Sequence, residues 1–360
     1  MRVYIYTGGE KIVGKSGVGQ AIRHQEASLT RCGVPVTERW TADAAVVHIN
    51  TVLPDAVFAA IGARLRGRRV VWYGHSTMED FRKSFRGSDA LAPLFRRWIT
   101  FCYNLGDVVI TPTAYSRRLL ESYGLRRPVY SLSNGVDTDF FRPNPALRAS
   151  FRRRYGLEEG ERAVISVGHT IARKGLPDFL ELARRMPETR FLWFGWTDPR
   201  LLPREIMEAM DSAPANVSFP GYVDRERLRE AYCGADVFAF LSHEETEGIV
   251  VLEALSCGIP TVVRDIPVYD GWLQNGENIY KASNLDGFQR NVAGILDGTL
   301  PDLTAAGRAT AEKRGLEAVG QALQEIYRRE RLLEPARRRT FLPLPRGAYG
   351  PAGQGPRRLP

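Results

Sequence analysis

The sequence predicts two successive α/β domains, each a doubly wound parallel sheet, with a cleft between them. Three observations lead to this fold class: short apolar runs alternate with amphipathic segments in the first half, a stretch rich in Asn, Gly, Asp and Pro follows at residues 134–145, and the alternation then starts again. A parallel sheet that is covered by helices on both faces produces this alternation. The length of 360 residues suits two domains of about 150 residues each.

In the first half, which we assign to a domain of residues 1–145, the expected strands are short and rich in β-branched residues. They cover residues 3–7, 45–49, 69–73, 108–111 and 129–131. Helical patterns lie between them, with amphipathic segments at residues 18–31 and near 116–123.

The second half repeats the pattern in a domain of residues 146–315. Its expected strands cover residues 163–167, 190–195, 217–219, 237–241 and 261–263, with helices at 176–186 and 225–233. A further helical pattern covers residues 316–333. Residues 335–360 are dense in Pro, Gly and Arg, a composition typical of disorder.

Composition narrows the class of protein without choosing a partner. The formal net charge of +9 suits an anionic membrane surface, phosphorylated substrates or nucleic acid. No apolar run approaches the roughly 20 residues that cross a bilayer. The opening MRVYIYTGG has strand character without a cleavage-site pattern, and the four cysteines have no metal-binding spacing. We therefore expect a cytoplasmic protein.

The most informative segment is ETEGIVVLEALSCGIPTVV, residues 245–263. Glu245 lies in a loop, and Glu253 lies two turns inside an apolar, helix-forming run that a Gly-x-Pro sequence ends. The start of such a helix faces anions favourably, and the two carboxylates can accept hydrogen bonds from two polyols of one ligand. A nucleotide-sugar offers sugar hydroxyls, a diphosphate and ribose hydroxyls in that series. Glu244 is one residue out of this spacing and is expected to lie in solvent.

This segment resembles the E-x7-E signature of the family-4 retaining glycosyltransferases, which have the GT-B fold of two Rossmann-like domains facing a cleft. The resemblance implies that Glu245 holds the donor sugar and Glu253 the ribose. It also implies that Gly248 and Ile249 offer N–H groups at the helix start. The helix at 316–333 would then be the closing helix, extending to about residue 334, that packs back on the first domain.

Residues 9–16, GEKIVGKS, raise a different class of protein, because they fit the P-loop pattern G-x-x-x-x-G-K-[ST] between a strand and a helix. A nucleotide hydrolase would use such a loop, and a nucleic-acid-binding protein would also suit the charge. Glu10 within the loop weighs against phosphate binding. In GT-B enzymes the first loop carries small residues near the donor phosphates, and the match here is Gly17 and Gly19. We therefore keep the P-loop class as the alternative.

The segment SVGHTIARKG, residues 166–175, supplies cations for a departing diphosphate. The family usually has an arginine after the glycine and a lysine five residues later. This chain keeps Lys174 but has His169 at the arginine position, with Arg173 beside the lysine. We expect Lys174 and Arg173 to contact the diphosphate.

Three further residues complete the expected site by resemblance. His75 follows a predicted strand end and resembles the histidine that lies near the donor sugar and acceptor, although a structural histidine is the rival interpretation. Asn134 lies at the cleft edge, and Gly221 belongs to a loop that resembles the one contacting the nucleobase. Asp137-Thr-Asp139 resembles a metal-binding DxD motif but lies in a turn-like linker, so we expect no metal and no cofactor.

Over most of residues 1–330 the chain looks like bacterial 1,2-diacylglycerol 3-glucosyltransferases. The resemblance implies transfer of glucose from UDP-glucose to diacylglycerol with the α configuration kept. Basic and aromatic residues in the first domain suit an anionic membrane surface, and also an RNA groove or an ordinary solvated face. We expect the membrane contact at Arg68, Arg69, Arg82, Lys83, Arg86 and Trp98. We expect no nucleic acid partner, and a soluble acceptor is the alternative within the same fold.

Overall fold

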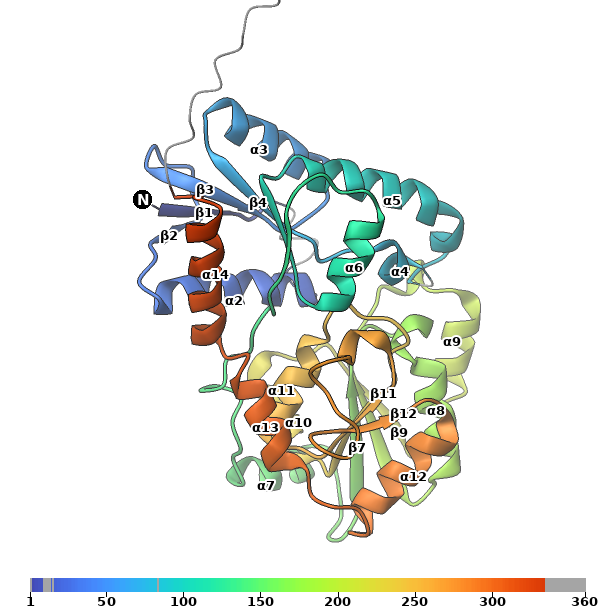
Figure 1. Cartoon of the computed structure of the whole chain (residues 1–360). Helices are drawn as coiled ribbons and strands as arrows, with labels where there is room; N and C mark the ends of the chain where they lie inside the picture. Colours follow the sequence, from blue (N-terminus) through green and yellow to red (C-terminus); the bar gives the residue numbers. More distant parts are fainter. Residues whose placement is uncertain (1, 9–13, 15, 83, 334–360) are drawn as a thin grey trace, which may run out of the picture.

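The computed structural model describes residues 2–8, 14, 16–82 and 84–333. Its strands form two parallel six-stranded sheets, each with its own helices. In Figure 1 the domain of the first sheet lies above the domain of the second. The predicted disordered segment at 335–360, the predicted membrane residue Lys83 and most of the P-loop pattern at 9–16 lie outside the described residues.

The first sheet has the strand order β2-β1-β3-β4-β5-β6. Its strands are β1 (Arg2–Tyr6), β2 (Val36–Thr37), β3 (Ala44–Ile49), β4 (Arg69–Tyr73), β5 (Val108–Thr111) and β6 (Val129–Ser131). The five predicted strands are present within a residue at each end. The edge strand β2 was not predicted, because two residues are too few to show a period.

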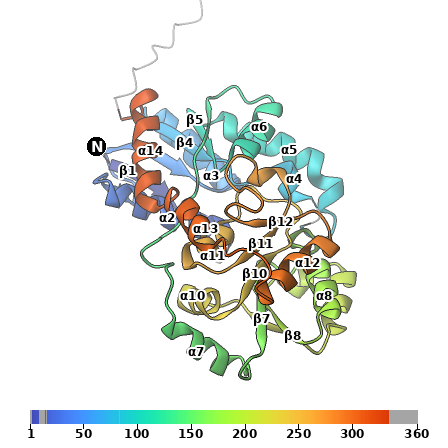
Figure 2. The same cartoon turned by 60° about the horizontal axis from the view of Figure 1, so that its bottom comes forward.

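Alternate residues of this sheet point to two different cores. On one face, Val46 and Val71 pack with α2 (Gly17–Arg31) and α14 (Leu316–Arg329), which lie side by side in Figures 1 and 2. On the other face, Val47 and Trp72 pack against α3 (Pro54–Leu65), α5 (Ser88–Asn104) and α6 (Ala114–Ser122). The helix that ends the described chain therefore belongs to the first sheet.

The second sheet has the strand order β12-β11-β10-β7-β8-β9. Its strands are β7 (Arg162–Val167), β8 (Thr189–Phe194), β9 (Val217–Gly221), β10 (Val237–Phe240), β11 (Thr261–Arg264) and β12 (Tyr280–Ala282). The covering helices are α7 (Ala146–Arg154), α8 (Leu176–Arg185), α9 (Arg204–Asp211), α10 (Arg225–Gly234), α11 (Ile249–Cys257), α12 (Leu285–Leu296) and α13 (Thr304–Glu312). The chain builds outward from β7 in one direction and then from β10 in the other, so the topological switch point lies between β7 and β10.

The chain passes between the two sheets twice. A parallel bridge joins Val136, on the first passage, to Gly315, on the return to α14. The two passages therefore run together. In the part of the chain that the structure describes, no helix has the length and apolar character needed to cross a membrane.

Candidate functional site

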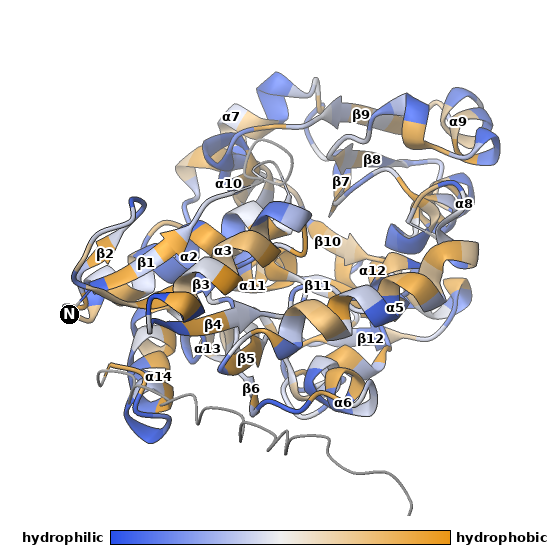
Figure 3. Cartoon of the chain, turned by 90° about the horizontal axis from the view of Figure 1, so that it is seen from above, coloured by the Kyte–Doolittle hydropathy of each residue, from blue (hydrophilic) through white to orange (hydrophobic). Residues whose placement is uncertain are grey.

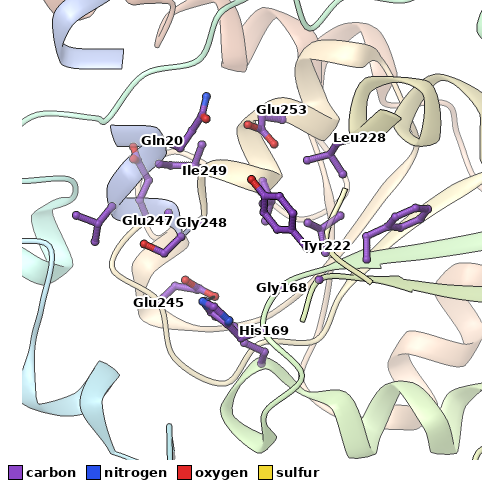
Figure 4. A pocket seen from close by; sticks show the side chains of 18 of the residues that line it. Gln20, Gly168, His169, Tyr222, Leu228, Glu245, Glu247, Gly248, Ile249 and Glu253 are labelled. Carbon is purple, nitrogen blue, oxygen red and sulfur yellow. Dashed lines mark hydrogen bonds and ion pairs between the residues drawn. The ribbon is translucent and has the colours of Figure 1, made fainter. Parts of the chain in front are cut away.

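A cavity of about 610 Å³ lies between the two sheets, lined by residues of both. From the first sheet side come the start of α2 and the residues after β4, including Gly17 and His75. From the second come the loops after β7 and β10 and the start of α11. Figure 4 shows Glu245, Glu247 and Glu253 around this cavity. Its position at the carboxyl ends of β7 and β10 is the switch point, where α/β folds bind ligands.

Glu245 and Lys174 form a buried ion pair at the centre of the cavity wall. The distance from Lys174 Nζ to Glu245 Oε1 is 2.5 Å, and the two side chains are 15% and 7% exposed. Burial opposes ionisation of Glu245, but the charges of Lys174 and Arg173 outweigh it and hold the pKa below its usual value. Burial also lowers the pKa of Lys174, against the pull of Glu245. Glu245, predicted to hold the donor sugar, and Lys174, predicted to contact the diphosphate, therefore neutralise each other's charge in the unliganded protein.

The helix α11 begins at a glycine because the chain must turn sharply into it. Gly248 has φ of 84°, and a Cβ there would lie 3.3 Å from the Tyr269 hydroxyl oxygen. This left-handed conformation suits glycine. Ile249 then starts the helix, and its first turn lines the cavity. The N–H groups of a first helical turn have no partner within the helix, so they are available to an anion.

Glu253 lies inside α11 and is 3% exposed. The Tyr232 hydroxyl donates a hydrogen bond to its Oε2 at 3.2 Å. Burial raises the pKa of Glu253 to about 7, and the Tyr232 hydrogen bond only partly opposes this. A carboxyl group with one neutral partner at the cavity wall has capacity to accept further hydrogen bonds from a ligand.

Glu247 is a buried carboxylate in the same loop that the sequence analysis missed. It is 2% exposed, and its Oε2 accepts hydrogen bonds from Asn134 N at 3.0 Å and Asn134 Nδ2 at 2.9 Å. Burial raises the pKa of Glu247. It ties the first interdomain passage to the loop that carries Glu245. Its spacing from Glu245 and Glu253 matches no motif, so the sequence did not indicate a role for it.

Arg173 faces the first domain, although its predicted contact was the donor diphosphate. It is 8% exposed, and its Nη1 lies 2.7 Å from Oδ1 of Asp80, which belongs to α4 (Met78–Phe81). Its Nε donates to Ser84 Oγ at 2.9 Å, and Nη1 also donates to the carbonyl oxygen of Glu244 at 2.7 Å. Arg173 therefore bridges the two domains at the cavity edge.

Glu244, expected in solvent, is half-buried, so that prediction was wrong. The Tyr115 hydroxyl of α6 donates to its carboxylate oxygens at 2.9 and 3.1 Å. Burial raises the pKa of Glu244 to about 7, the hydrogen bond from Tyr115 opposes the rise, and the negative charges of Asp80 and Glu245 add to it. Sequence spacing alone could not show that a tyrosine 129 residues away covers this carboxylate.

His75 is buried just after the end of β4 and lines the cavity. Its Nε2 lies 2.9 Å from Asn50 Oδ1, and its ring stacks on Tyr73 with the planes at 18°. Burial lowers the pKa of His75 to about 4. The histidine is therefore neutral at physiological pH.

The predicted glycines have different surroundings. A Cβ on Gly19 would lie 2.5 Å from the Gly14 carbonyl oxygen, so close backbone packing requires glycine there. Gly17 lines the cavity and has open space where a Cβ would lie. Gly221 has φ of 77° at the end of β9, beside the cavity-lining Tyr222. His169, at the position of the family's arginine, donates from Nδ1 to the Trp196 carbonyl oxygen at 3.1 Å and lines the cavity.

The described members of the predicted membrane set lie in three different parts of the first domain. Arg69 lies 3.7 Å from Asp107 Oδ1 at the amino end of β4, and Arg68 donates to the Ala42 carbonyl oxygen nearby. Arg82 and Arg86 are exposed near α4 and α5. Trp98 is half-buried, and its Nε1 donates to the Val52 carbonyl oxygen at 2.7 Å. Trp98 packs α5 against its neighbours and is not a free anchor.

Asp137, the first residue of the DxD pattern, pairs with Arg31 at 3.0 Å and Arg225 at 3.3 Å. Two cations occupy its carboxylate. Among the described residues, no cluster of three or more His, Cys, Asp or Glu side chains is arranged to hold a metal ion.

Comparison with known proteins agrees with this fold. The family description "Glycosyl transferases group 1" matches residues 148–313, and "Glycosyltransferase Family 4" matches residues 31–140. A processive diacylglycerol alpha-glucosyltransferase from Acholeplasma laidlawii is 36% identical over 329 residues, covering 91% of this chain and 98% of that protein. An alpha-galactosylglucosyldiacylglycerol synthase from Streptococcus pneumoniae is 29% identical, covering 75% of this chain and 74% of that protein.

Solved structures share the fold at low sequence identity. Anabaena Alr3699/HepE in complex with UDP-glucose aligns with a TM-score of 0.73 and 16% identity, over 91% of this chain and all of that one. A glycosyltransferase from Rickettsia africae aligns with a TM-score of 0.65 and 12% identity, over 91% and 98% of the two chains. These matches leave the P-loop alternative without support. The chain belongs to the family-4 glycosyltransferases of the GT-B fold and is a sugar-transferring enzyme.

Proposed function

We propose that this enzyme transfers a hexose, with glucose as the first choice, from a UDP-sugar to the free hydroxyl of diacylglycerol. The observation that carries this proposal is the 36% identity over 91% of the chain to a processive diacylglycerol alpha-glucosyltransferase. A relative named as a galactosylglucosyldiacylglycerol synthase supports the same acceptor class. The likeness in fold to a protein that holds UDP-glucose supports the donor class.

The arrangement of the cavity suits a long donor. Glu245 near Lys174 would hold sugar hydroxyls, the start of α11 and Lys174 would face the diphosphate, and Glu253 would accept hydrogen bonds from the ribose. Diphosphate binding would draw Lys174 away from Glu245 and free that carboxylate for the sugar. Ligand binding thus replaces one buried ion pair by two ligand contacts.

The proposed reaction keeps the configuration of the sugar. The acceptor oxygen attacks the anomeric carbon from the side on which the diphosphate leaves, the bond from that carbon to the diphosphate oxygen breaks, and this oxygen takes the acceptor's proton. No protein base is needed, so the residues act by orienting the reactants and stabilising charge. We propose that the reaction requires no metal and no cofactor, because Lys174 and helix N–H groups supply the positive charge.

A lipid acceptor requires a surface that meets the bilayer, and the outer faces of α3 and α5 offer one. Large apolar side chains project into solvent there, with Leu65 83%, Phe58 74% and Leu94 65% exposed. Ile61, Leu91 and Phe101 extend this set, which we call the α3–α5 face. Figure 3 shows apolar residues along both helices. The cations Arg82 at the end of α4, Arg86 just before α5 and Arg97 on α5 are exposed, so anionic headgroups would attract them. We propose that the enzyme acts at the membrane surface, on its cytoplasmic face.

The direct test is a transfer assay. The full chain is incubated with labelled UDP-glucose and diacylglycerol in mixed micelles that contain an anionic lipid, with EDTA present, and UDP-galactose is tested in parallel. The expected result is labelled lipid in the organic phase, whose α anomer is checked by NMR and which disappears in Glu245→Gln. Transfer only to a soluble acceptor would overturn the lipid acceptor, and a requirement for added metal would overturn the metal-free mechanism. Absence of transfer from every UDP-sugar would overturn the donor class.

A further inference from the structure

A buried row of three polar side chains leads from the cavity wall into the first domain. Gln25 of α2, Asn50 after β3 and His75 after β4 are 4%, 3% and 9% exposed. Removed from water, these groups depend on one another for hydrogen bonds. Only His75 lines the cavity. The other two lie behind it and have no ligand of their own to contact.

Gln25 and Asn50 pair through both atoms of their amides. Gln25 Nε2 donates to Asn50 Oδ1 at 2.7 Å, and Asn50 Nδ2 donates back to Gln25 Oε1 at 3.1 Å. The pair fixes the plane of the Asn50 amide and couples its direction to that of Gln25, so that one amide can turn over only with the other. Asn50 Oδ1 also lies 2.9 Å from Nε2 of His75. Because an amide oxygen can only accept, this contact requires the His75 proton on Nε2.

The remaining ring nitrogen of His75 is then an acceptor. Nδ1 has no hydrogen-bond partner among the described residues and is not among the polar atoms sealed in the interior. Burial lowers the pKa of His75 to about 4, so the ring carries no charge at neutral pH. A neutral ring with the proton on Nε2 presents a lone pair at Nδ1 to a ligand in the cavity.

We infer that Gln25 and Asn50 are positioning residues that fix the tautomer of His75, so that its Nδ1 accepts a hydrogen bond from a hydroxyl of the bound reactants. The hydroxyl belongs either to the transferred sugar or to the acceptor, so this part of the inference rests on the proposed function. The tautomer itself rests on the geometry alone.

An amide suits this task better than a carboxylate. A carboxylate at the position of Asn50 would attract a second proton to the ring and turn Nδ1 into a donor. The amide selects the same tautomer without adding charge. The cavity wall already holds the charged groups Asp80, Arg173, Lys174, Glu245 and Glu247, and Tyr73 stacks on the histidine ring. A neutral partner keeps His75 outside this network of charges.

The test begins with ring-labelled histidine in the full chain. The signal of His75 is assigned by its loss in His75→Gln, and the ring nitrogen and carbon shifts then report which nitrogen carries the proton. We expect the Nε2–H tautomer in the unliganded wild type. An Nδ1–H tautomer would mean that both amides are turned over, and it would overturn the inference. This measurement needs no substrate, so it stands even if the proposed acceptor is wrong.

Two substitutions then connect the tautomer to activity. Asn50→Asp should make the His75 ring titrate at higher pH and should move the acid limb of the kcat profile in the same direction. Gln25→Met should populate the Nδ1–H tautomer and lower kcat about tenfold with little change in donor KM, which corresponds to one lost hydrogen bond. Glu26→Met, exposed on the same helix, is the matched control and should change neither the spectrum nor kcat. Wild-type spectra and kcat in folded Gln25→Met would overturn the positioning role.

The source of the hydroxyl follows from one comparison in Gln25→Met. A fall in both UDP-glucose hydrolysis and transfer to lipid identifies a sugar hydroxyl as the partner. A fall in transfer alone identifies the acceptor hydroxyl. Either result supports the inference, whereas a fall in neither overturns it.

Discussion

Glu245 and Glu253, the two glutamates of the E-x7-E signature, are both buried but have opposite electrostatic surroundings. Glu245 has Lys174 at 2.5 Å, which keeps it ionised, whereas Glu253 accepts a hydrogen bond from the neutral Tyr232 hydroxyl and is stabilised more weakly by the charges of Arg225 and Arg23. Burial raises the pKa of Glu253 from 4.5 to about 7. This carboxyl therefore makes the unliganded fold less stable as pH rises from 4.5 to about 7, because its ionised form is preferred in the unfolded chain.

This setting predicts pH-dependent donor binding. If ribose hydroxyls donate to the ionised carboxylate, UDP-glucose should bind about tenfold more weakly at pH 6 than at pH 8, since one pKa unit corresponds to a tenfold change. Calorimetric titration measures this, and UDP-glucose itself does not titrate in the range. Glu253→Gln should bind weakly with no such slope. A slope that persists in Glu253→Gln would assign the titration to another group.

At the scale of elements, α2 and α14 approach closely because of one glycine. A Cβ on Gly320 would lie 2.3 Å from the Ser28 carbonyl oxygen and 2.5 Å from Cys32 Sγ. The clash is with backbone, so the helices must separate to relieve it. Gly320→Ala should lower the free energy of unfolding by about 1–3 kcal/mol, as overpacking does.

The matched control is Gly62→Ala in α3, where the added Cβ meets only the flexible end of Arg66 at 3.1 Å. Alanine's higher helix propensity should leave Gly62→Ala neutral or stabilised by up to about 1 kcal/mol. Thermal or urea unfolding of the two variants measures the difference. Equal stability of both would contradict the packing argument for α14.

The contact between the 3-10 turn at Ala172–Lys174 and α4 gives a second prediction at this scale. If Arg173 acts through its 2.7 Å pair with Asp80, then Arg173→Ala and Asp80→Ala should each lower kcat/KM for UDP-glucose about tenfold. The double variant should be no worse than either single one. If Arg173 instead binds the diphosphate on its own, the two effects should add. Arg204→Ala, in an exposed pair with Glu208, serves as the control and should have little effect.

The sequence was a good guide to these elements and a poor guide to their contacts. Strands such as β4 and β5 were predicted to the residue, because both are continuous β-branched and aromatic runs. Glu245, Glu253 and Lys174 line one cavity, because strand ends of a parallel sheet meet at one edge. The contact of Glu247 with Asn134 crosses 113 residues and leaves no local pattern.

For the molecule as a whole, the sequence could not tell which large apolar residues face outward. Trp98 was expected at the membrane but is tied to Val52, while Leu94, one turn earlier on α5, is 65% exposed. Both fit a basic, aromatic helix, and only the packing of α5 on the sheet separates them. The exposed apolar side chains of the α3–α5 face were therefore recognised from the structure and not from the sequence.

Removing apolar side chains from this face should release the enzyme from membranes. Phe58→Ser with Leu65→Ser should weaken sedimentation with vesicles containing anionic lipid at least tenfold, because each buried side chain contributes about 1.5–3 kcal/mol. UDP-glucose affinity should stay unchanged. Leu201→Ser, 55% exposed in the second domain, is the matched control. Unaltered vesicle binding by the double variant would show that the α3–α5 face is not the membrane contact.

The bridge between Val136 and Gly315 has a mechanical consequence for this architecture. A rotation of the two domains about these paired passages would open the cleft at its opposite edge. In Figure 1 the return passage into α14 and the helix α4 lie on opposite sides of the molecule. The contact of Arg173 with Asp80 lies at this opposite edge, where a small rotation produces the greatest separation. An opening that admits a donor in this way would break the contact of Arg173 with Asp80 before it disturbs the bridge between Val136 and Gly315.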